Sequence, residues 1–503
     1  RIAKNSIFMS IRMVIVLLIT LYSTRVVLDV LGVEDYGIYN VVCGFVSMFA
    51  FLNTSMSNGI QRFFNFELGR NGEEGAKNVY NTAVIIQLIL GIVILIGAEG
   101  VGVWYINNKM VIPPERLFAA NWIFQFSLLS FIFIIMQAPY SAAVISHERM
   151  DFYAVVSVLD AFLKLGIVFL IPYLEGDDLI WYGILLAGVS LTNFILYFTY
   201  CKRKFTEIIF EKGFDRQLFK SMLGFSGWNV FGSFSIMMKD HGVNLVLNLF
   251  FGPIVNASRG IATQVNGGIN SFVSNITIPV RPQIVQSYAK GDVDRALKLT
   301  YGIMKLSSCF FFMISLPICL EINYILGLWL GTNIPDYANT FVVIILATAF
   351  TSNLHSAICN LSHATGKMKV FQTVGSCIKL MSVPIAYIFM FLGFTAEVAL
   401  IVVMVMDWLA HIASCFVLRT LMKFPLRVYA FKVVLPILTT ILLSSLIPML
   451  FFFNMNYGVL RVLAVSVSSC LSVIFCVYTI CLDDDEKKIF VQMIKGIKNK
   501  MKI

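Results

Sequence analysis

Charge is scarce in this sequence. Asp, Glu, Lys and Arg make up 13% of the 503 residues, whereas soluble domains carry about 25%. Hydrophobic residues make up 58%, more apolar surface than a soluble core could bury. The few charges lean basic, with a formal net charge of +10. In a soluble protein this balance would indicate nucleic acid. Here, however, Lys and Arg cluster in short segments between long apolar runs, as topology signals do, so we exclude nucleic acid as a partner.

Signatures of catalysis are also missing. No Gly-rich phosphate loop occurs, so direct use of ATP is not expected. The ten cysteines form no Cys-x-x-Cys pair, and we interpret them as small buried hydrophobes. An acidic run at residues 483–486 could belong to a glycosyltransferase metal site, but it opens a basic amphipathic tail. That context favours a helix cap and an interfacial helix. We expect no enzyme activity, no metal and no cofactor.

Long apolar runs dominate the chain. Fourteen of them have about the 20 residues needed to cross a hydrocarbon core of ~30 Å. They span residues 7–31, 37–60, 79–104, 117–141, 152–174, 179–201, 225–250, 258–283, 300–329, 339–363, 370–392, 396–419, 430–453 and 457–482. The first is too long for a cleavable signal. The sequence therefore predicts an all-α integral membrane protein with fourteen transmembrane helices.

Lys and Arg are unevenly distributed around these runs. If the N-terminus is cytoplasmic, only Lys109, Arg116 and Arg461 of the 38 Lys and Arg fall in outside segments. Such a bias sets orientation by the positive-inside rule. We therefore expect both termini in the cytoplasm. The connecting segments are too short for a large extramembrane domain, so the protein acts within the bilayer.

Two halves of the chain echo each other. Leu31-Gly32 ends the first run, and Phe251-Gly252 ends the seventh. The echo predicts a parallel repeat about an axis along the membrane normal, a common transporter plan; chance similarity of short apolar motifs is the alternative. The predicted parts are a six-helix lobe at 1–203, a cytoplasmic linker at 204–224, a second six-helix lobe at 225–424, two further helices at 425–482 and a basic cytoplasmic tail at 483–503.

Four motifs make the chain resemble a known family. They are LGVEDYGIYN at 31–40, SGWNVFGSF at 226–234, NLFFGPIVNASRGIATQVN at 248–266 and PQIVQSYAKGD at 282–292. With them the chain resembles the polysaccharide-exporter (Wzx-type) branch of the multidrug/oligosaccharidyl-lipid/polysaccharide (MOP) superfamily, over essentially its whole length. One departure is that Lys239-Asp240-His241 stand before Gly242, where this branch usually has polar uncharged residues.

The resemblance implies a function and a location. Relatives look like flippases of the bacterial inner membrane. They move undecaprenyl-diphosphate-linked oligosaccharide, a repeat unit of O-antigen in lipopolysaccharide, of capsule or of exopolysaccharide, from the cytoplasmic to the periplasmic leaflet by alternating access. The implied partners are this lipid-linked glycan, the bilayer, and a polysaccharide polymerase with its chain-length regulator.

Basic side chains inside the apolar runs fit such a cargo. A Lys or Arg at the centre of a membrane helix costs about 2.5–3.5 kcal/mol, so a chain keeps several only when they line a polar interior. These runs contain Arg12, Arg25, Lys164, Lys239, Arg259, Arg281, Lys305 and Lys379. Arg binds phosphate oxygens bidentately, and Lys acts as a point charge. The pattern indicates a basic cavity for an anion such as a lipid diphosphate.

The eighth run carries a polar stripe. Arg259, Thr263, Asn266, Asn270 and Ser274 recur at helical spacing on one face. Such a stripe does not face lipid, so it faces either a lumen or another helix. We select Arg259, Asn266 and Asn270 as candidate contacts to the diphosphate or the sugar.

The seventh run places charges near mid-membrane. Lys239, Asp240 and Asn244 lie there, and Lys239 and Asn244 are candidate substrate contacts. Neighbouring residues point about 100° apart on an α-helix, so we expect Lys239 and Asp240 not to pair directly and each to have a partner on another helix. A buried structural ion pair is the alternative for Lys239. Asp240 is also a candidate for ion coupling.

Three further basic residues complete the candidate set. Arg25 shares a face of the first run with Asp29, and a local pair between them is the alternative to substrate binding. Arg12 lies about 140° around the helix from Arg25, so both reach one lumen only if the helix bends or Arg12 extends toward the interface. Lys379 is a mid-run candidate in the second half.

Other embedded charges fit structural roles better. Asp160 and Lys164 stand four residues apart and are expected to neutralise each other. Arg281 and Lys305 lie close enough to the inside ends of their runs to extend to the interface.

Asp407 and His411 form another pair four residues apart. They are candidates for binding a coupling proton or cation, and a satisfied buried pair is the alternative.

Three other functions are weighed against the flippase. A multidrug or organic-cation antiporter of the same superfamily should present an acidic, aromatic cavity, whereas the central residues here lean basic. A membrane-embedded polysaccharide polymerase or ligase should carry its catalytic residues on a substantial periplasmic loop, which this sequence lacks. A purely structural scaffold would not keep Lys239 and Arg259 in mid-membrane.

Overall fold

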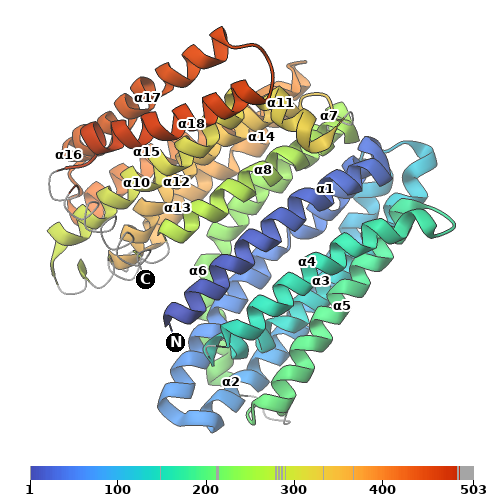
Figure 1. Cartoon of the computed structure of the whole chain (residues 1–503). Helices are drawn as coiled ribbons and strands as arrows, with labels where there is room; N and C mark the ends of the chain where they lie inside the picture. The colour runs from blue at the N-terminus through green and yellow to red at the C-terminus, as the bar shows by residue number, and fades with distance from the viewer. Residues whose placement is uncertain are drawn as a thin grey trace. The chain divides into compact units, whose positions relative to one another are not determined.

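The computed structural model is built from helices, and no strand occurs among the residues that it describes (Figure 1). These are residues 2–147, 149–210, 215–277, 280, 284, 287–288, 291–331, 334–365, 368–483 and 487. The predicted fold class, all-α, is confirmed. The predicted basic tail, apart from residues 483 and 487, lies outside the described residues.

The helices group into two compact units. The first holds the described residues from 2 to 261, with 329–338 and 379–402, and the second holds the rest. These borders follow packing and differ from those of the two predicted six-helix lobes, which stay a prediction.

The first unit is mainly the N-terminal half of the chain. Its elements are α1 (Ile2–Ser47), α2 (Ala50–Asn108), η1 (Pro114–Arg116), α3 (Leu117–Ser146), α4 (Met150–Leu170), η2 (Ile171–Tyr173), α5 (Asp178–Lys204), α6 (Arg216–Met237), η3 (Met238–Gly242), α7 (Val243–Phe251), the start of α8 (Pro253–Thr277) and α14 (Ser382–Phe391). Helix α3 packs between α2 and α5, and α1 packs on α4 (Figure 1). A cluster that includes Phe64, Tyr80, Tyr140 and Met222 forms part of its core.

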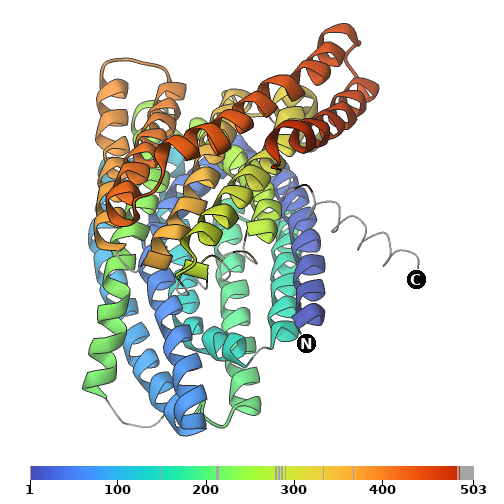
Figure 2. The same cartoon turned by 90° about the vertical axis from the view of Figure 1, so that its left-hand side faces the viewer.

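The second unit contains most of the remaining helices. They are α10 (Val293–Leu320), α11 (Ile322–Leu330), α12 (Ala338–Thr365), α13 (Met368–Leu380), α15 (Ala396–Met422), α16 (Leu426–Tyr429), η5 (Ala430–Val434), α17 (Leu435–Asn454), α18 (Val459–Cys476) and η6 (Val477–Cys481). Helices α17 and α18 lie side by side in both views (Figures 1 and 2). Small residues join them: the Ser472 hydroxyl donates to the Ser444 carbonyl at 2.7 Å, a contact typical of packed membrane helices.

The helices are long and apolar enough for a multi-pass membrane protein. Among the described residues, eleven segments meet the length and composition needed to cross a bilayer. They overlap the first predicted run and part of the second, the third to sixth, and the ninth to fourteenth. The described residues of the seventh and eighth runs are helical but are not among the eleven. The total of fourteen transmembrane helices stays a prediction.

Two glycines interrupt helices at the places that the internal echo puts in correspondence. Gly32 has φ +76° and ψ 170° inside α1, and Gly252 has φ +78° and ψ −171° between α7 and α8. Residues with a Cβ are strained at such positive φ values. The matching conformations support the prediction of a repeat.

The two family-like motifs next to these glycines pack against each other within the first unit. A Cβ added to Gly37 would lie 2.0 Å from the Pro253 carbonyl oxygen, and one added to Gly260 would lie 2.7 Å from the Asn40 side-chain oxygen. The second half of α1 and the start of α8 therefore cross at backbone contact. This explains why both motifs carry glycine at these positions.

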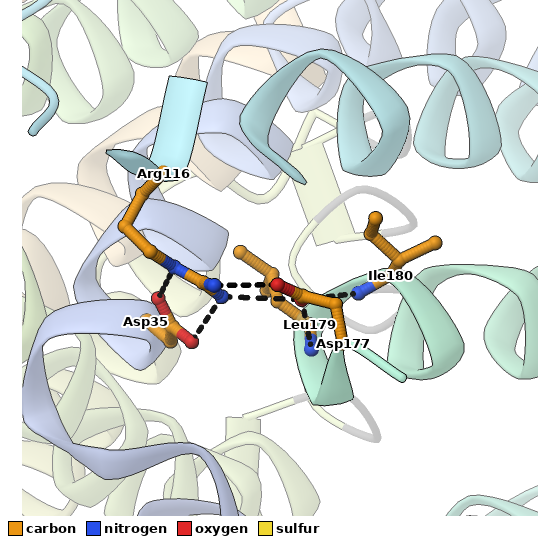
Figure 3. Close-up of polar contacts among 5 residues, drawn as sticks. All are labelled: Asp35, Arg116, Asp177, Leu179 and Ile180. Atoms are coloured by element: carbon orange, nitrogen blue, oxygen red, sulfur yellow. Dashed lines mark hydrogen bonds and ion pairs between the residues drawn. The ribbon is translucent and has the colours of Figure 1, made fainter. Parts of the chain in front are cut away.

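An ion cluster ties three segments of the first unit together. Figure 3 shows the Arg116 guanidinium between Asp35 of α1 and Asp177, the N-cap of α5. Arg116 Nε lies 2.7 Å from Asp35 Oδ1, and Arg116 Nη2 lies 3.1 Å from Asp177 Oδ1. Asp177 also accepts backbone N–H bonds from Leu179 and Ile180 (Figure 3). Burial raises the pKa of Asp177, but the bonds from Arg116 and the two N–H groups outweigh it and lower the pKa below its ordinary value.

A matching pair occurs in the second unit. Arg461 donates from Nε to Glu321 Oε1 at 2.7 Å and from Nη2 to Oε2 at 2.8 Å. Two of the three basic residues predicted outside, Arg116 and Arg461, are thus neutralised by carboxylates. The orientation of the chain in the membrane stays a prediction.

Replacing Arg116 with leucine is expected to lower the free energy of unfolding by about 1–3 kcal/mol, because two partly buried carboxylates would then face each other. The loss should appear as a lower Tm of the detergent-solubilised protein. Because the folded-state pKa of Asp177 is lowered, its stabilisation is present above its unfolded pKa of about 3.9 and is lost as pH falls. Lys164→Leu, which removes an exposed pair, is the control. Equal Tm values for Arg116→Leu and wild type would contradict the role of the cluster.

Candidate functional site

The five basic candidate residues belong to one packing unit. Arg12, Arg25, Lys239, Arg259 and Lys379 all lie in the first unit, although they come from both halves of the sequence. The unit combines α1 and α2 with the α6 to α8 segment. Packing therefore brings these charges onto elements that share one compact body.

A π-helical turn, η3, positions Lys239 and Asp240. Lys239 is buried, and its Nζ lies 3.7 Å from Asp240 Oδ1, while the Asp240 side chain is 52% exposed. The expectation that these neighbours would not pair is wrong. It assumed α-helical geometry, whereas the π turn changes the side-chain directions and the long Lys stem bends back to the carboxylate. π turns occur frequently at functional sites.

Arg259 adds a second buried cation. It is 6% exposed on the first turns of α8 and lies within electrostatic range of Asp240 on η3. Asp240 is thus a shared counter-ion for Lys239 and Arg259. Among these three residues positive charge exceeds negative charge, which favours an anion as a ligand.

Asparagines hold the turn between α7 and α8. Asn256 Nδ2 donates to the Asn244 backbone carbonyl at 2.8 Å and to its Oδ1 at 2.9 Å. Asn248 Nδ2 donates to Asn256 Oδ1 at 3.1 Å, and Asn248 Oδ1 accepts the Val111 N–H at 3.0 Å. Asn244 therefore has a structural partner here, and its contact with a sugar stays a prediction. Asn256 was not among the candidates, although it lies within a family-like motif.

Arg25 and Arg12 contact different surroundings along α1. Arg25 is exposed, and a Cβ added to Gly331 would lie 3.9 Å from its guanidinium. The adjacent Trp329 donates to the Leu21 carbonyl at 2.6 Å and holds that segment on α1. The Arg12 guanidinium lies 4.9 Å from the centre of the Tyr153 ring of α4. These separate contacts agree with the helical phase that places the two arginines on different faces.

Lys379 lies on α13, and the asparagines of the polar stripe lie on α8. Lys379 is half-buried near the end of α13, and its carbonyl accepts the Ser382 hydroxyl. Asn270 Nδ2 donates to Asn266 Oδ1 at 2.7 Å, and both side chains are half-buried. The two asparagines thus share one face of α8, as their spacing predicts.

The second unit contains a buried polar cluster around His411. His411 Nε2 lies 2.8 Å from the Tyr429 hydroxyl, and its ring centre is 6.0 Å from that of His355. Asp407 is buried and accepts the Ser352 hydroxyl at 3.3 Å. Both interpretations of Asp407 and His411, a satisfied buried pair and ion coupling, stay predictions. His355 comes from another run and Tyr429 from the segment before the thirteenth run, so no spacing in the sequence could have associated them with His411.

The embedded charges that were predicted to have structural roles have different outcomes. Lys164 and Asp160 pair at 2.9 Å, as predicted. Lys305 is buried at 1% exposure, and its Nζ lies 3.4 Å from Oδ2 of Asp483 at the start of the predicted tail, so its extension to the interface stays a prediction. Burial of the charge is tolerated because this carboxylate neutralises it. Arg281 lies outside the described residues. Within the described part of the chain no cluster of His, Cys, Asp and Glu could hold a metal ion.

Comparison with known proteins supports the predicted fold, and the Wzx-type branch stays a prediction. No family model and no curated protein match the sequence. Solved structures do match its fold. An inward-facing multidrug resistance MATE family transporter of the MOP superfamily is 15% identical, with a TM-score of 0.65, over 80% of this chain and 94% of its own. The lipid II flippase MurJ, in an inward closed conformation, is 15% identical, with a TM-score of 0.66, over 93% and 98%.

A third structure is a MOP superfamily transporter from Pyrococcus furiosus, whose binding pocket is described as having reverse polarity. It is 16% identical, with a TM-score of 0.59, over 85% of this chain and 96% of its own. Identities this low establish the fold alone. The chain is a multi-pass helical membrane protein with the fold of MOP superfamily transporters.

Proposed function

We propose that this protein is a flippase that moves a diphosphate-linked lipid oligosaccharide from the cytoplasmic to the periplasmic leaflet of the bacterial inner membrane. The observation that carries the proposal is the pair of buried cations, Lys239 and Arg259, next to the carboxylate of Asp240. A lipid diphosphate is a compact polyanion. It can take the place of Asp240 as a partner of both cations, with charge-assisted hydrogen bonds from Arg259.

The chemistry requires no covalent step. The headgroup needs only a polar, basic environment that opens to one side of the membrane and then to the other, while the polyprenyl tail stays in lipid. Asn266 and Asn270 of α8 supply amide donors and acceptors suited to sugar hydroxyls. Arg25 and Lys379 are further cationic contacts, and Arg12 has the weakest claim because it stacks on Tyr153.

Several features of the proposal extend beyond the site. Undecaprenyl diphosphate is the proposed lipid carrier, and a polymerase with its chain-length regulator are the proposed downstream partners. Both termini are proposed to be cytoplasmic, and no cofactor is required. Asp407, His411 and Asp240 are the proposed groups for ion coupling. A cation exporter of the same superfamily is disfavoured because the cluster of Lys239, Asp240 and Arg259 carries net positive charge.

Purified protein in liposomes provides the test. A fluorescent glycan linked to a polyprenyl diphosphate is placed in both leaflets, and a membrane-impermeant quencher reports how fast the inner pool becomes accessible. We expect faster exchange with the protein than in empty liposomes, and no faster exchange of the same glycan on a neutral polyprenol. Transport of a fluorescent organic cation without movement of the lipid would overturn the proposal in favour of the antiporter.

A further inference from the structure

The segment after α5 presents two apolar side chains to the surroundings. Ile209 is 55% exposed and Phe210 is 50% exposed. They follow α5, the last helix before the predicted cytoplasmic linker, by only a few residues. Exposed apolar side chains are ordinary on a membrane-spanning helix. In a connecting segment at the end of such a helix, two adjacent exposed apolar side chains can contact a partner.

Tertiary contacts fix this segment on the first unit. The Phe205 ring stacks on His147 with ring centres 4.2 Å apart, and Glu207 Oε1 lies 2.5 Å from His147 Nε2. The Thr206 hydroxyl donates to Glu73 of α2 at 2.5 Å. Ile208 is buried in the core cluster of the unit. Because four successive residues are anchored, the outward direction of Ile209 and Phe210 is built into the fold.

Basic side chains lie directly beside this apolar pair. Lys202, Arg203 and Lys204 form the last turn of α5 and are all exposed. The nearby carboxylate of Glu207 is buried against His147, so it does not neutralise them at the surface. Arg149 is not counted with these three basic residues, because Asp151 pairs with it at 3.1 Å and neutralises its charge. The exposed surface thus combines three cations and two apolar side chains with one carboxylate, that of Glu73, which accepts the Thr206 hydroxyl.

We propose that residues 202–210 form a docking site for anionic phospholipid in the cytoplasmic leaflet. Ile209 and Phe210 insert at the headgroup level, and Lys202, Arg203 and Lys204 bind the phosphate groups around them. Basic residues at the cytoplasmic end of a membrane helix attract acidic lipids, and apolar side chains at the interface add burial. The charge of the three side chains selects acidic over zwitterionic lipid. This site is separate from the diphosphate cluster on η3 and α8, and only its assignment to the cytoplasmic leaflet rests on the orientation given with the proposed function.

Native mass spectrometry of the full-length protein with added phosphatidylglycerol or phosphatidylcholine tests the basic part. The variant K202Q/R203Q/K204Q is expected to bind phosphatidylglycerol more weakly, by about fivefold for each charge removed, with phosphatidylcholine unchanged. The matched control is R419Q/K423Q/R427Q, which removes three exposed basic residues elsewhere. Equal losses in both triple variants, or none in the first, would overturn the site.

Hydrogen exchange in lipid nanodiscs tests the apolar part. Amides of residues 206–210 are expected to exchange more slowly in bilayers that contain phosphatidylglycerol than in phosphatidylcholine alone. The double variant I209S/F210S should lose this difference while keeping its Tm. If the protection is independent of lipid and disappears when residues 484–503 are deleted, the occupant is the chain's own tail and the proposal is wrong.

Discussion

Alanine in place of Lys239 or Arg259 is expected to reduce export of the lipid-linked glycan at least about thirtyfold. Each cation is proposed to bind phosphate oxygens, a hydrogen bond to a charged group contributes up to about 3 kcal/mol, and 1.4 kcal/mol corresponds to a factor of ten. Both side chains are buried, and Asp240 is a counter-ion of both. Removing either cation leaves the carboxylate to repel the incoming diphosphate.

The measurement is export in a strain that lacks its own flippase, with membrane insertion of each variant checked by fluorescence-detected gel filtration. Lys164→Ala is the matched control, because Lys164 is exposed and paired with Asp160, and it should export normally. Arg25→Ala is expected to fall between these extremes, since its side chain is exposed. Normal export by correctly inserted Lys239→Ala, Arg259→Ala and Arg25→Ala variants would refute the basic site.

Alanine at Gly37 is expected to destabilise the first unit by about 3 kcal/mol, the upper range for overpacking of a tight contact. The new Cβ would lie 2.0 Å from the Pro253 carbonyl oxygen, and a backbone atom cannot rotate away as a side chain can. The start of α8, which carries Arg259, would have to shift from α1. We therefore expect a lower Tm of the purified protein and reduced export.

Two variants make this result interpretable. Gly97→Ala is the control, because a Cβ there meets nothing within 4 Å, and alanine should leave the Tm unchanged or raise it slightly. Gly260→Ala would meet the Asn40 amide at 2.7 Å, so the second substitution Asn40→Ala should restore part of the lost stability. A Gly37→Ala variant as stable as Gly97→Ala would show that the crossing of α1 and α8 is looser than described.

The sequence alone predicted side-chain contacts within a helix at several positions. The spacing of Asp160 and Lys164 predicted their pair, because residues four apart always meet on an α-helix. The polar stripe of α8 places Asn266 and Asn270 together for the same reason. Helical spacing did not predict the pair of Lys239 and Asp240, since a π turn has different side-chain directions. It could not predict the pair of Lys305 and Asp483 either, because Asp483 comes from a distant segment.

The sequence by itself determined that the chain is an all-helical membrane protein. That conclusion needs only the length of the apolar runs and the cost of burying unpaired backbone groups in lipid, and neither depends on which helices touch. Tertiary structure decided which polar groups meet. Packing joined Lys239, Asp240 and Arg259 from two helical segments, set Gly37 against Pro253, and anchored residues 205–208 beneath Ile209 and Phe210. Such contacts depend on how separate helices pack, which periodicity along one helix does not specify.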